Sequence, residues 1–439
     1  MKKILIYIVG LFLLAGCEKE KVDLTFGEKP EERMSQRLNE LRGMLTSAEN
    51  GWKAHLTTGA KGGYGFYFNF EDAKNVKMLS DLTAATSTSA NTSTYRVIWA
   101  MNASLVFDTF NYLTMLQEPS GNYGGTAPNG YQSDIEFEYV KNSGDSIYMR
   151  GKRYKQPLIL TKATAAEKVA YNDGSYKTSI DKTTAVYQSY SNPYIEVDLA
   201  GVKTRIALTL SNTSKTIDFG SVDASNKAII NTSKFAFNLT GFDILSGGLH
   251  RDVLFTRGEV EGNNLSVYDS NGTKYPVMST NMPILPIDVM FNYSGAFNGM
   301  AINGLTLPPG INSSFNATWT ALTNFHASNN MRTVSLTFKL TSARVATLDV
   351  RFTNGSTVYS ASADYNYTLV DGTLTLTSPI STNGNWNNGW VSLAVRNYFD
   401  KGVFKLTYLT SSDPNAGTIG GLIKSNDETA IFYGKLGRY

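Results

Sequence analysis

The sequence has little of the residue types that build disulfides, metal sites and catalytic clusters. Its 439 residues include one cysteine, Cys17, and three histidines, His55, His250 and His326. A single thiol excludes an intramolecular disulfide and a multi-cysteine zinc site. The histidines stand far apart, and none belongs to a metal-binding spacing such as His-Glu-x-x-His. We therefore expect no metal and no cofactor.

Charged residues are also scarce, at 18% of the chain against about 25% in a typical globular protein. Lys and Arg number 40 and Asp and Glu number 37, so the balance is nearly neutral. A chain of this charge without basic clusters has no electrostatic basis for binding nucleic acid. We expect no nucleic-acid partner.

Motifs of the common enzyme classes are missing as well. No Gly-x-Ser-x-Gly motif precedes a helical pattern, and the glycine-rich run at 59–65 leads into a strand pattern rather than a helix. Sequence analysis therefore assigns no catalytic residue. A polysaccharide or peptide hydrolase stays open as an alternative, because the two carboxylates that a glycosidase uses can come from any part of a β-protein.

The N-terminus, by contrast, has a recognisable pattern. Lys2 and Lys3 precede an apolar run from Ile4 to Leu14, and Ala15, Gly16 and Cys17 follow. This run is shorter than the roughly 20 residues of a membrane-spanning helix, and it is typical of a bacterial lipoprotein signal peptide. We predict cleavage after residue 16, lipid attachment at Cys17, and membrane attachment through that lipid. The expected location is the cell envelope, at the outer membrane, on either its periplasmic or its surface face. A free cysteine after an ordinary signal peptide is the alternative.

One amphipathic helix is predicted after a charged tether at residues 17–27. Pro30 fits the first turn of a helix, and acidic residues surround it. Apolar residues then recur at spacings of three and four, at Met34, Leu38, Leu41, Leu45 and Ala48. We expect this face to pack on the domain that follows, and Asn50-Gly51 to end the helix.

Beyond this helix the composition favours strands. Ser, Thr, Asn and Gly replace the missing charges, and Tyr and Phe are abundant. Asn271-Gly272 and Asp371-Gly372 each separate two strand patterns and predict tight hairpins. A short helix is possible over Ala163–Tyr171. The predicted fold is all-β, made mainly of antiparallel meanders that form barrel-like or sandwich sheets, with one N-terminal amphipathic helix.

A proline-rich stretch at 279–310 suggests a domain boundary near Ser294, because proline is poorly tolerated in central strands. We therefore predict a helix-plus-β domain over residues 28–293 and a C-terminal β-domain over residues 294–439.

Several short motifs follow one another in the first of these domains. They are Gly51-Trp52, Gly62-Gly63-Tyr64, Phe107-Asp108-Thr109-Phe110-Asn111, Phe137, and Asp145-Ser146-Ile147 with Gly151-Lys152. In this order, residues 25–290 resemble a family of uncharacterised Bacteroidetes cell-envelope lipoproteins that carry a domain of unknown function. Members are often encoded beside outer-membrane uptake systems of the starch-utilisation type. The resemblance implies an envelope accessory protein and no catalytic residue.

Asp108 lies between aromatic positions of this motif. A buried lone carboxylate is costly, so we expect Asp108 to bind a backbone N–H group or a nearby Arg or Lys.

The candidate ligand-binding segment is the Asn/Gly-rich stretch at 383–390. The Trp386 and Trp390 rings could stack on a sugar, with the amides of Asn385 and Asn387 supplying hydrogen bonds. The alternative is that the tryptophans cap a β-core. We predict a non-enzymatic binding accessory of a nutrient-uptake system, with a glycan, peptide or partner protein as ligand; a structural or adhesive surface protein is a second alternative.

Overall fold

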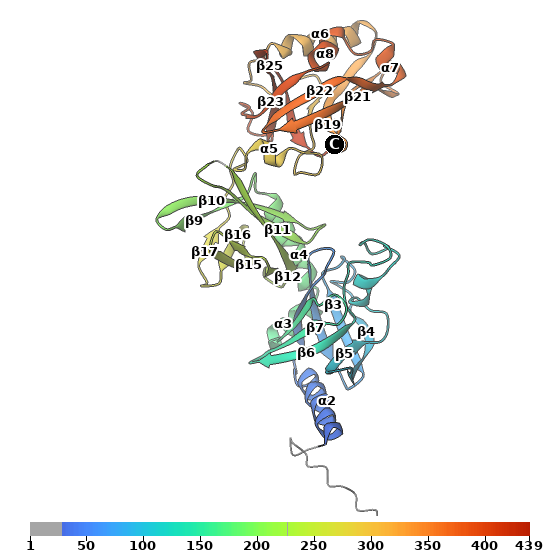
Figure 1. Ribbon diagram of the computed structural model, residues 1–439, viewed down its shortest axis with the longest axis vertical. Coiled ribbons are helices and arrows are strands. Elements are labelled where there is room, and N and C mark those ends of the chain that lie inside the picture. The colour runs from blue at the N-terminus through green and yellow to red at the C-terminus, as the bar shows by residue number, and fades with distance from the viewer. Residues whose placement is uncertain (1–28, 226) are drawn as a thin grey trace, which may run out of the picture. The chain divides into compact units, whose positions relative to one another are not determined.

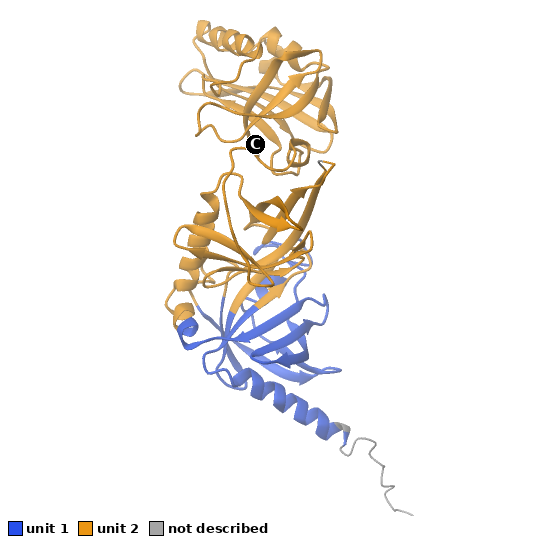
Figure 2. Ribbon diagram, turned by 90° about the vertical axis from the view of Figure 1, so that its left-hand side faces the viewer, with its two compact units in different colours: residues 1–54, 67–79, 90–168 blue, residues 55–66, 80–89, 169–439 orange. Residues whose placement is uncertain are grey.

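A computed structural model describes residues 29–225 and 227–439. The predicted signal peptide, Cys17 and the whole tether lie outside the described residues. The chain forms two compact units (Figure 2): residues 1–54, 67–79 and 90–168 make the first, and residues 55–66, 80–89 and 169–439 make the second. The boundary expected near Ser294 stays a prediction.

Helix α2, Pro30–Thr46, begins with proline in its first turn and with Glu31 and Glu32 near its N-terminus. Leu41 and Leu45 are buried, and the indole N–H of Trp52 donates to the Leu45 carbonyl oxygen at 2.8 Å. The helix packs against β4 and β5, so its apolar face docks on its own domain as expected. It ends before the predicted stop, which leaves Gly51 in a turn with φ 76°.

The first eight strands close into a barrel in the order β1 to β8 (Figure 1). Their bounds are β1 Trp52–Thr57, β2 Gly63–Phe70, β3 Asn75–Ser80, β4 Asn91–Trp99, β5 Ala103–Phe107, β6 Glu136–Ser143, β7 Ser146–Gly151 and β8 Pro157–Lys162. The pattern of β4 is typical of a barrel wall: Tyr95 and Val97 are buried, and Arg96 between them is exposed. A 3₁₀ turn, η1 Thr114–Gln117, follows β5.

The next sheet is antiparallel and runs in the order β17-β16-β15-β13-β12-β11-β10-β9, with β14 paired to β15. Its strands are β9 Tyr194–Leu199, β10 Val202–Ser211, β11 Thr216–Val222, β12 Ala228–Phe237, β13 Gly241–Ser246, β14 Leu249–His250, β15 Val253–Glu261, β16 Asn264–Asp269 and β17 Lys274–Pro276. Helix α4, Ser175–Gln188, packs against β13, β15 and β16. Tyr176, Thr183 and Val186 form its buried face.

The last eight strands close into a second barrel in the order β18 to β25. They are β18 Gly299–Asn303, β19 Arg332–Leu340, β20 Val345–Thr353, β21 Val358–Val370, β22 Thr373–Thr382, β23 Val403–Leu409, β24 Ile419–Lys424 and β25 Asp427–Gly437. The helices of this region are α5 Ile287–Met290, α6 Phe315–Ser328, α7 Gly384–Asn387 and α8 Leu393–Phe399. Aromatic rings from α6, α8 and the strands fill its core; Phe315 and Phe432, for example, have ring centroids 5.4 Å apart.

The predicted all-β fold is confirmed, since antiparallel strands in barrels and a sheet are the main secondary structure of the described residues. Asp371 and Gly372 have φ of 47° and 73°, and they join β21 to β22 as the two-residue hairpin that the sequence predicts. The possible helix near residue 163 is α3, Ala165–Asn172. Helices α4 and α6 were not predicted, because their many Ser, Thr and Asn residues give little helical pattern. Among residues 29–225 and 227–439, no helix is long and apolar enough to span a bilayer.

Candidate functional site

The two tryptophans proposed as ligand-binding residues lie against the core of the C-terminal barrel. Trp386, on α7, is only 4% exposed, and the Arg396 guanidinium lies 4.9 Å from the centre of its ring. Trp390 is half-buried and stacks on Phe352 with ring centroids 4.8 Å apart. This placement is the one that the core-capping alternative expects.

The neighbouring amides bind the same barrel. The Asn385 amide nitrogen donates to the Ser360 carbonyl oxygen at 2.9 Å, and the Asn387 amide oxygen accepts from the Thr382 hydroxyl at 2.9 Å. These contacts use hydrogen-bonding groups that a sugar would need. The role of the loop in ligand binding stays a prediction.

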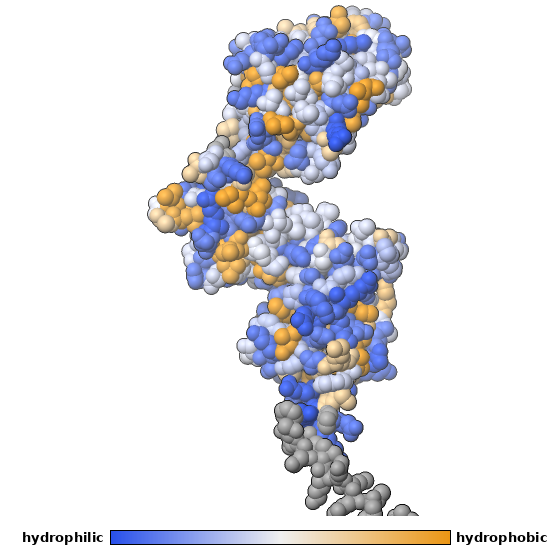
Figure 3. All heavy atoms as spheres, viewed as in Figure 1, coloured by the Kyte–Doolittle hydropathy of each residue, from blue (hydrophilic) through white to orange (hydrophobic). Residues whose placement is uncertain are grey.

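A different aromatic pair is exposed in the first unit. Phe110 is 57% exposed and Tyr123 is 37% exposed, and their ring centroids lie 6.1 Å apart. On the face drawn in Figure 3, hydrophobic residues occur in small groups among hydrophilic ones, as on most soluble surfaces. Exposure alone therefore does not define a site, and the supporting contacts of these two residues matter more.

Phe110 belongs to the Phe107–Asn111 motif, which is held on both sides. The single N–H of Arg96 Nε is shared between the two carboxylate oxygens of Asp108, at 2.7 and 2.8 Å, so the expected partner of this carboxylate is confirmed as an arginine. Asn111 is fully buried, and its amide oxygen accepts from the backbone N–H groups of Leu113 and Thr114 at 3.0 and 2.9 Å. These bonds hold the backbone on each side of Phe110.

Tyr123 is held by the glycine-rich loop 120–130. The Tyr131 hydroxyl donates to the Tyr123 carbonyl oxygen at 2.7 Å. Gly124 and Gly125 adopt φ of 98° and 84°, a conformation that residues with a side chain rarely adopt. The loop therefore presents an aromatic ring on an ordered backbone. The sequence indicated the Phe107–Asn111 motif, but it did not indicate Phe110 and Tyr123 as a pair.

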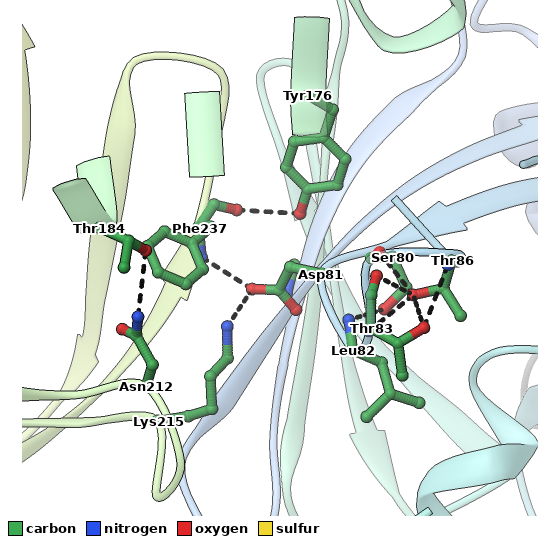
Figure 4. Close-up of polar contacts among 11 residues, drawn as sticks. Ser80, Asp81, Leu82, Thr83, Thr86, Tyr176, Thr184, Asn212, Lys215 and Phe237 are labelled. Carbon is green, nitrogen blue, oxygen red and sulfur yellow. Dashed lines mark hydrogen bonds and ion pairs between the residues drawn. The ribbon is translucent and has the colours of Figure 1, made fainter. Parts of the chain in front are cut away.

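A buried ion pair forms the most unusual polar centre of the second unit (Figure 4). Asp81 directly follows β3, and Lys215 lies in the turn between β10 and β11. The Lys215 ammonium contacts Asp81 Oδ2, and the two side chains are 5% and 0% exposed. The other Asp81 contacts are backbone N–H groups: Gly65 donates to Oδ1 at 3.0 Å and Phe237 donates to Oδ2 at 2.9 Å.

Aromatic rings surround the lysine head group. Lys215 Nζ lies 4.3 Å from the ring centre of Phe237, 5.1 Å from that of Phe235 and 5.5 Å from that of Tyr64. Burial raises the pKa of Asp81 and lowers the pKa of Lys215, while the attraction between the two groups opposes both shifts. Desolvation is thus the largest influence on the pKa values of both groups, and it favours the uncharged forms of Asp81 and Lys215.

The glycines of the Gly62-Gly63-Tyr64-Gly65 run allow this centre to form. A Cβ atom on Gly62 would collide with the backbone carbonyl of Lys215, and one on Gly65 would collide with that of Phe237. The run therefore brings its backbone into direct contact with β12 and with the turn before β11. Sequence analysis noted the glycines but missed Asp81 and Lys215, because 134 positions separate the two residues.

His250 lies in a second buried polar network. Its Nε2 is 2.9 Å from Ser221 Oγ, and its Nδ1 is 2.7 Å from the amide oxygen of Asn231. Arg251 Nε donates to the same serine oxygen at 3.0 Å, so the serine hydroxyl donates to the imidazole and Nδ1–H donates to Asn231. The connectivity resembles that of a serine nucleophile and its base, but Ser221 and His250 are fully buried. A substrate has no access, so the network is structural.

No group of three or more His, Cys, Asp or Glu residues that could hold a metal ion occurs in the described part of the chain.

The chain is thus an all-β protein with two closed barrels and a nine-stranded antiparallel sheet. Residues 22–252 match the family described as "Domain of unknown function (DUF4302)". Because this match covers more than half of the sequence, the chain belongs to that family. No curated protein matches the chain.

Solved structures show only distant similarity. A protein with unknown function from the DUF3598 family of Nostoc punctiforme PCC 73102 is 12% identical, with 58% of this chain and 98% of that chain covered and a TM-score of 0.13. A double mutant of Transferrin Binding Protein B from Haemophilus parasuis Hp5 is 10% identical, with 85% and 64% covered and a TM-score of 0.13. Similarity at these TM-scores supports no conclusion about function.

Proposed function

We propose that this protein is a lipid-anchored cell-envelope accessory that binds a glycan without transforming it, as part of a nutrient-uptake system. The observation that carries the proposal is the exposed Phe110–Tyr123 pair on an ordered backbone. Two aromatic rings held in water present flat apolar faces, and the C–H face of a sugar ring packs well on such a surface.

Polar groups beside the rings fit the same ligand class. Asp108, which pairs with Arg96 of β4, lies two residues before Phe110, and the exposed Asn122 precedes Tyr123. Sugar hydroxyls need both donors and acceptors, which a guanidinium, a carboxylate and an amide supply together. A purely apolar partner surface would cover these charged and polar groups without offering them any hydrogen bond, so they favour a glycan over an apolar protein face.

Attachment to the membrane is supported by the sequence from Lys2 to Cys17 and by the family resemblance. In the producing bacterium, Cys17→Ala is expected to move the protein from the membrane fraction to the soluble fraction. Attachment of this variant at the wild-type level would contradict lipidation at Cys17.

The binding site is tested with the full chain carrying Cys17→Ala, titrated with a panel of oligosaccharides by calorimetry. Phe110→Ala and Tyr123→Ala are each expected to weaken binding by about tenfold, or about 1.4 kcal/mol. Trp99→Ala is the matched control, because Trp99 is an exposed aromatic residue (41%) on β4 of the same barrel. Unchanged affinity in the Phe110→Ala, Tyr123→Ala double variant would refute this site, and the absence of any glycan ligand would refute the function.

A further inference from the structure

We propose that Lys215 and Asp81 are a modification site at which the protein forms an internal isopeptide bond between the lysine amine and the aspartate side-chain carboxyl. The inference is independent of the proposed function. It rests on three features of the centre: direct contact between amine and carboxyl, nearly complete burial of both groups, and an enclosing set of aromatic rings.

The reaction needs no partner beyond these two side chains. A proton passes from the Lys215 ammonium to the Asp81 carboxylate, which leaves a neutral amine beside a neutral carboxylic acid. The amine nitrogen then attacks the carboxyl carbon, and a C–N bond forms. The hydroxyl of the tetrahedral intermediate leaves with a proton from the nitrogen. One amide and one water are the products, and nothing is oxidised or reduced.

The surroundings favour the neutral pair from which this step begins. Burial raises the pKa of the Asp81 carboxyl and lowers that of the Lys215 ammonium, so desolvation acts on both groups in the required direction. In water the same pair is ionised, and an ammonium group has no lone pair with which to attack. The surrounding aromatic rings therefore favour the neutral amine and carboxylic acid here, whereas an ion pair on the surface stays charged.

The carboxyl group is also positioned for attack. Backbone N–H groups of Gly65 and Phe237 donate to its two oxygens, at 3.0 and 2.9 Å. Negative charge develops on a carboxyl oxygen in the tetrahedral intermediate, and fixed N–H donors stabilise such charge in a site without water. The same donors hold the carboxyl plane still, so the amine meets the carbon in one orientation.

The amine is held in place from the other side. Lys215 has φ 57°, a left-handed backbone conformation that is uncommon for a residue with a side chain. Its backbone carbonyl accepts from Phe235 N–H at 3.1 Å and lies against Gly62, which has no Cβ to displace it. Backbone strain of this kind persists where the surrounding structure enforces it, and here it directs the lysine into the centre.

An amide also explains why a charged pair occupies this position. Two buried charges contribute little net stability, because the cost of desolvation offsets their attraction. A neutral amide removes the charges and permanently joins the loop after β3 to the turn before β11, across 134 positions of sequence. Exclusion of water then protects the new bond from hydrolysis.

The test is a tryptic digest of the full chain, purified from the cells that produce it and analysed by mass spectrometry. Trypsin releases Asp81 within residues 78–96 and cleaves after Lys215 when its side chain is free. The isopeptide bond blocks that cleavage, so the expected product is residues 78–96 joined to residues 206–227, lighter than the two peptides together by the mass of one water. Fragmentation locates the link at Asp81 and Lys215.

The variant Lys215→Arg keeps a positive charge but has no nucleophilic amine, so it should release residues 78–96 as a free peptide. The Lys177–Asp181 pair on α4 is an internal control, because its side chains are 28% and 61% exposed. Cleavage after Lys177 should proceed normally. Full recovery of free peptides 78–96 and 206–215 from the wild-type protein would overturn the proposal, and the pair would then be an ion pair only.

Discussion

Acid should destabilise the nine-stranded sheet through His250, and the hydrogen-bond network around this residue sets the size of the effect. Burial and the adjacent Arg251 lower the pKa of His250 from 6.5 to about 4. Protonation of Nε2 would leave the Ser221 hydroxyl without its acceptor and would place a second cation beside Arg251. The folded protein therefore binds a proton at His250 less readily than the unfolded chain does.

The sign of the effect follows from proton binding. Between pH 6.5 and about 4 the unfolded chain binds a proton at His250 that the folded protein does not bind. The stability contributed by the neutral histidine is therefore fully present above pH 6.5 and falls as the pH decreases through this window. From pH 7 to pH 5 the expected loss is about 1–2 kcal/mol, before most carboxylates titrate.

Hydrogen exchange measured on peptides from β11 and β12 reports the free energy of opening of this region. After correction for intrinsic exchange, protection should fall roughly 5- to 30-fold from pH 7 to pH 5. The variant His250→Gln should lose this pH dependence. Peptides from β19 should keep theirs in the same variant, because buried His326 bonds Thr333 on that strand and also has a lowered pKa. An equal pH dependence of β11 and β12 in wild type and His250→Gln would refute the reasoning.

Two further predictions concern stability. Gly62→Ala should destabilise the protein by about 1–3 kcal/mol, because its Cβ would collide with the Lys215 backbone. Gly43→Ala, in the last turn of α2 where a Cβ meets no other atom, should stabilise the protein by about 0.5–1 kcal/mol. Equal effects of the two substitutions in thermal unfolding would contradict this contrast. Trp386→Ala should lower the free energy of unfolding by about 3–5 kcal/mol, because the ring is 4% exposed. Tyr293→Ala, at a residue that is 45% exposed, should change the free energy of unfolding by about 0.5 kcal/mol or less. Wild-type stability of Trp386→Ala in chemical denaturation would show that the ring is not part of the core.

Features that depend on a few neighbouring residues were predictable from the sequence. The Asp371-Gly372 hairpin formed as expected because both residues tolerate a left-handed backbone. Helix α2 was predicted from its proline and its apolar spacing, and it docks through Leu41 and Leu45. The short range of turn and helix signals also explains the helices that were missed: α4 and α6 become helical through burial of a few side chains on the sheets.

The sequence by itself determined the all-β class, because strand-forming composition and turn residues are local features of the chain. The lipoprotein signal peptide and lipid attachment at Cys17 stay predictions. Only the tertiary structure decided which side chains meet. It placed Trp386 in a core, left Phe110 exposed beside Tyr123, and enclosed Lys215 with Asp81. The contact between Lys215 and Asp81 depends on strand order and on close backbone contact at Gly62, which bring together residues 134 positions apart. Contacts between residues so far apart produce no local spacing pattern in the sequence, so the sequence alone does not predict them.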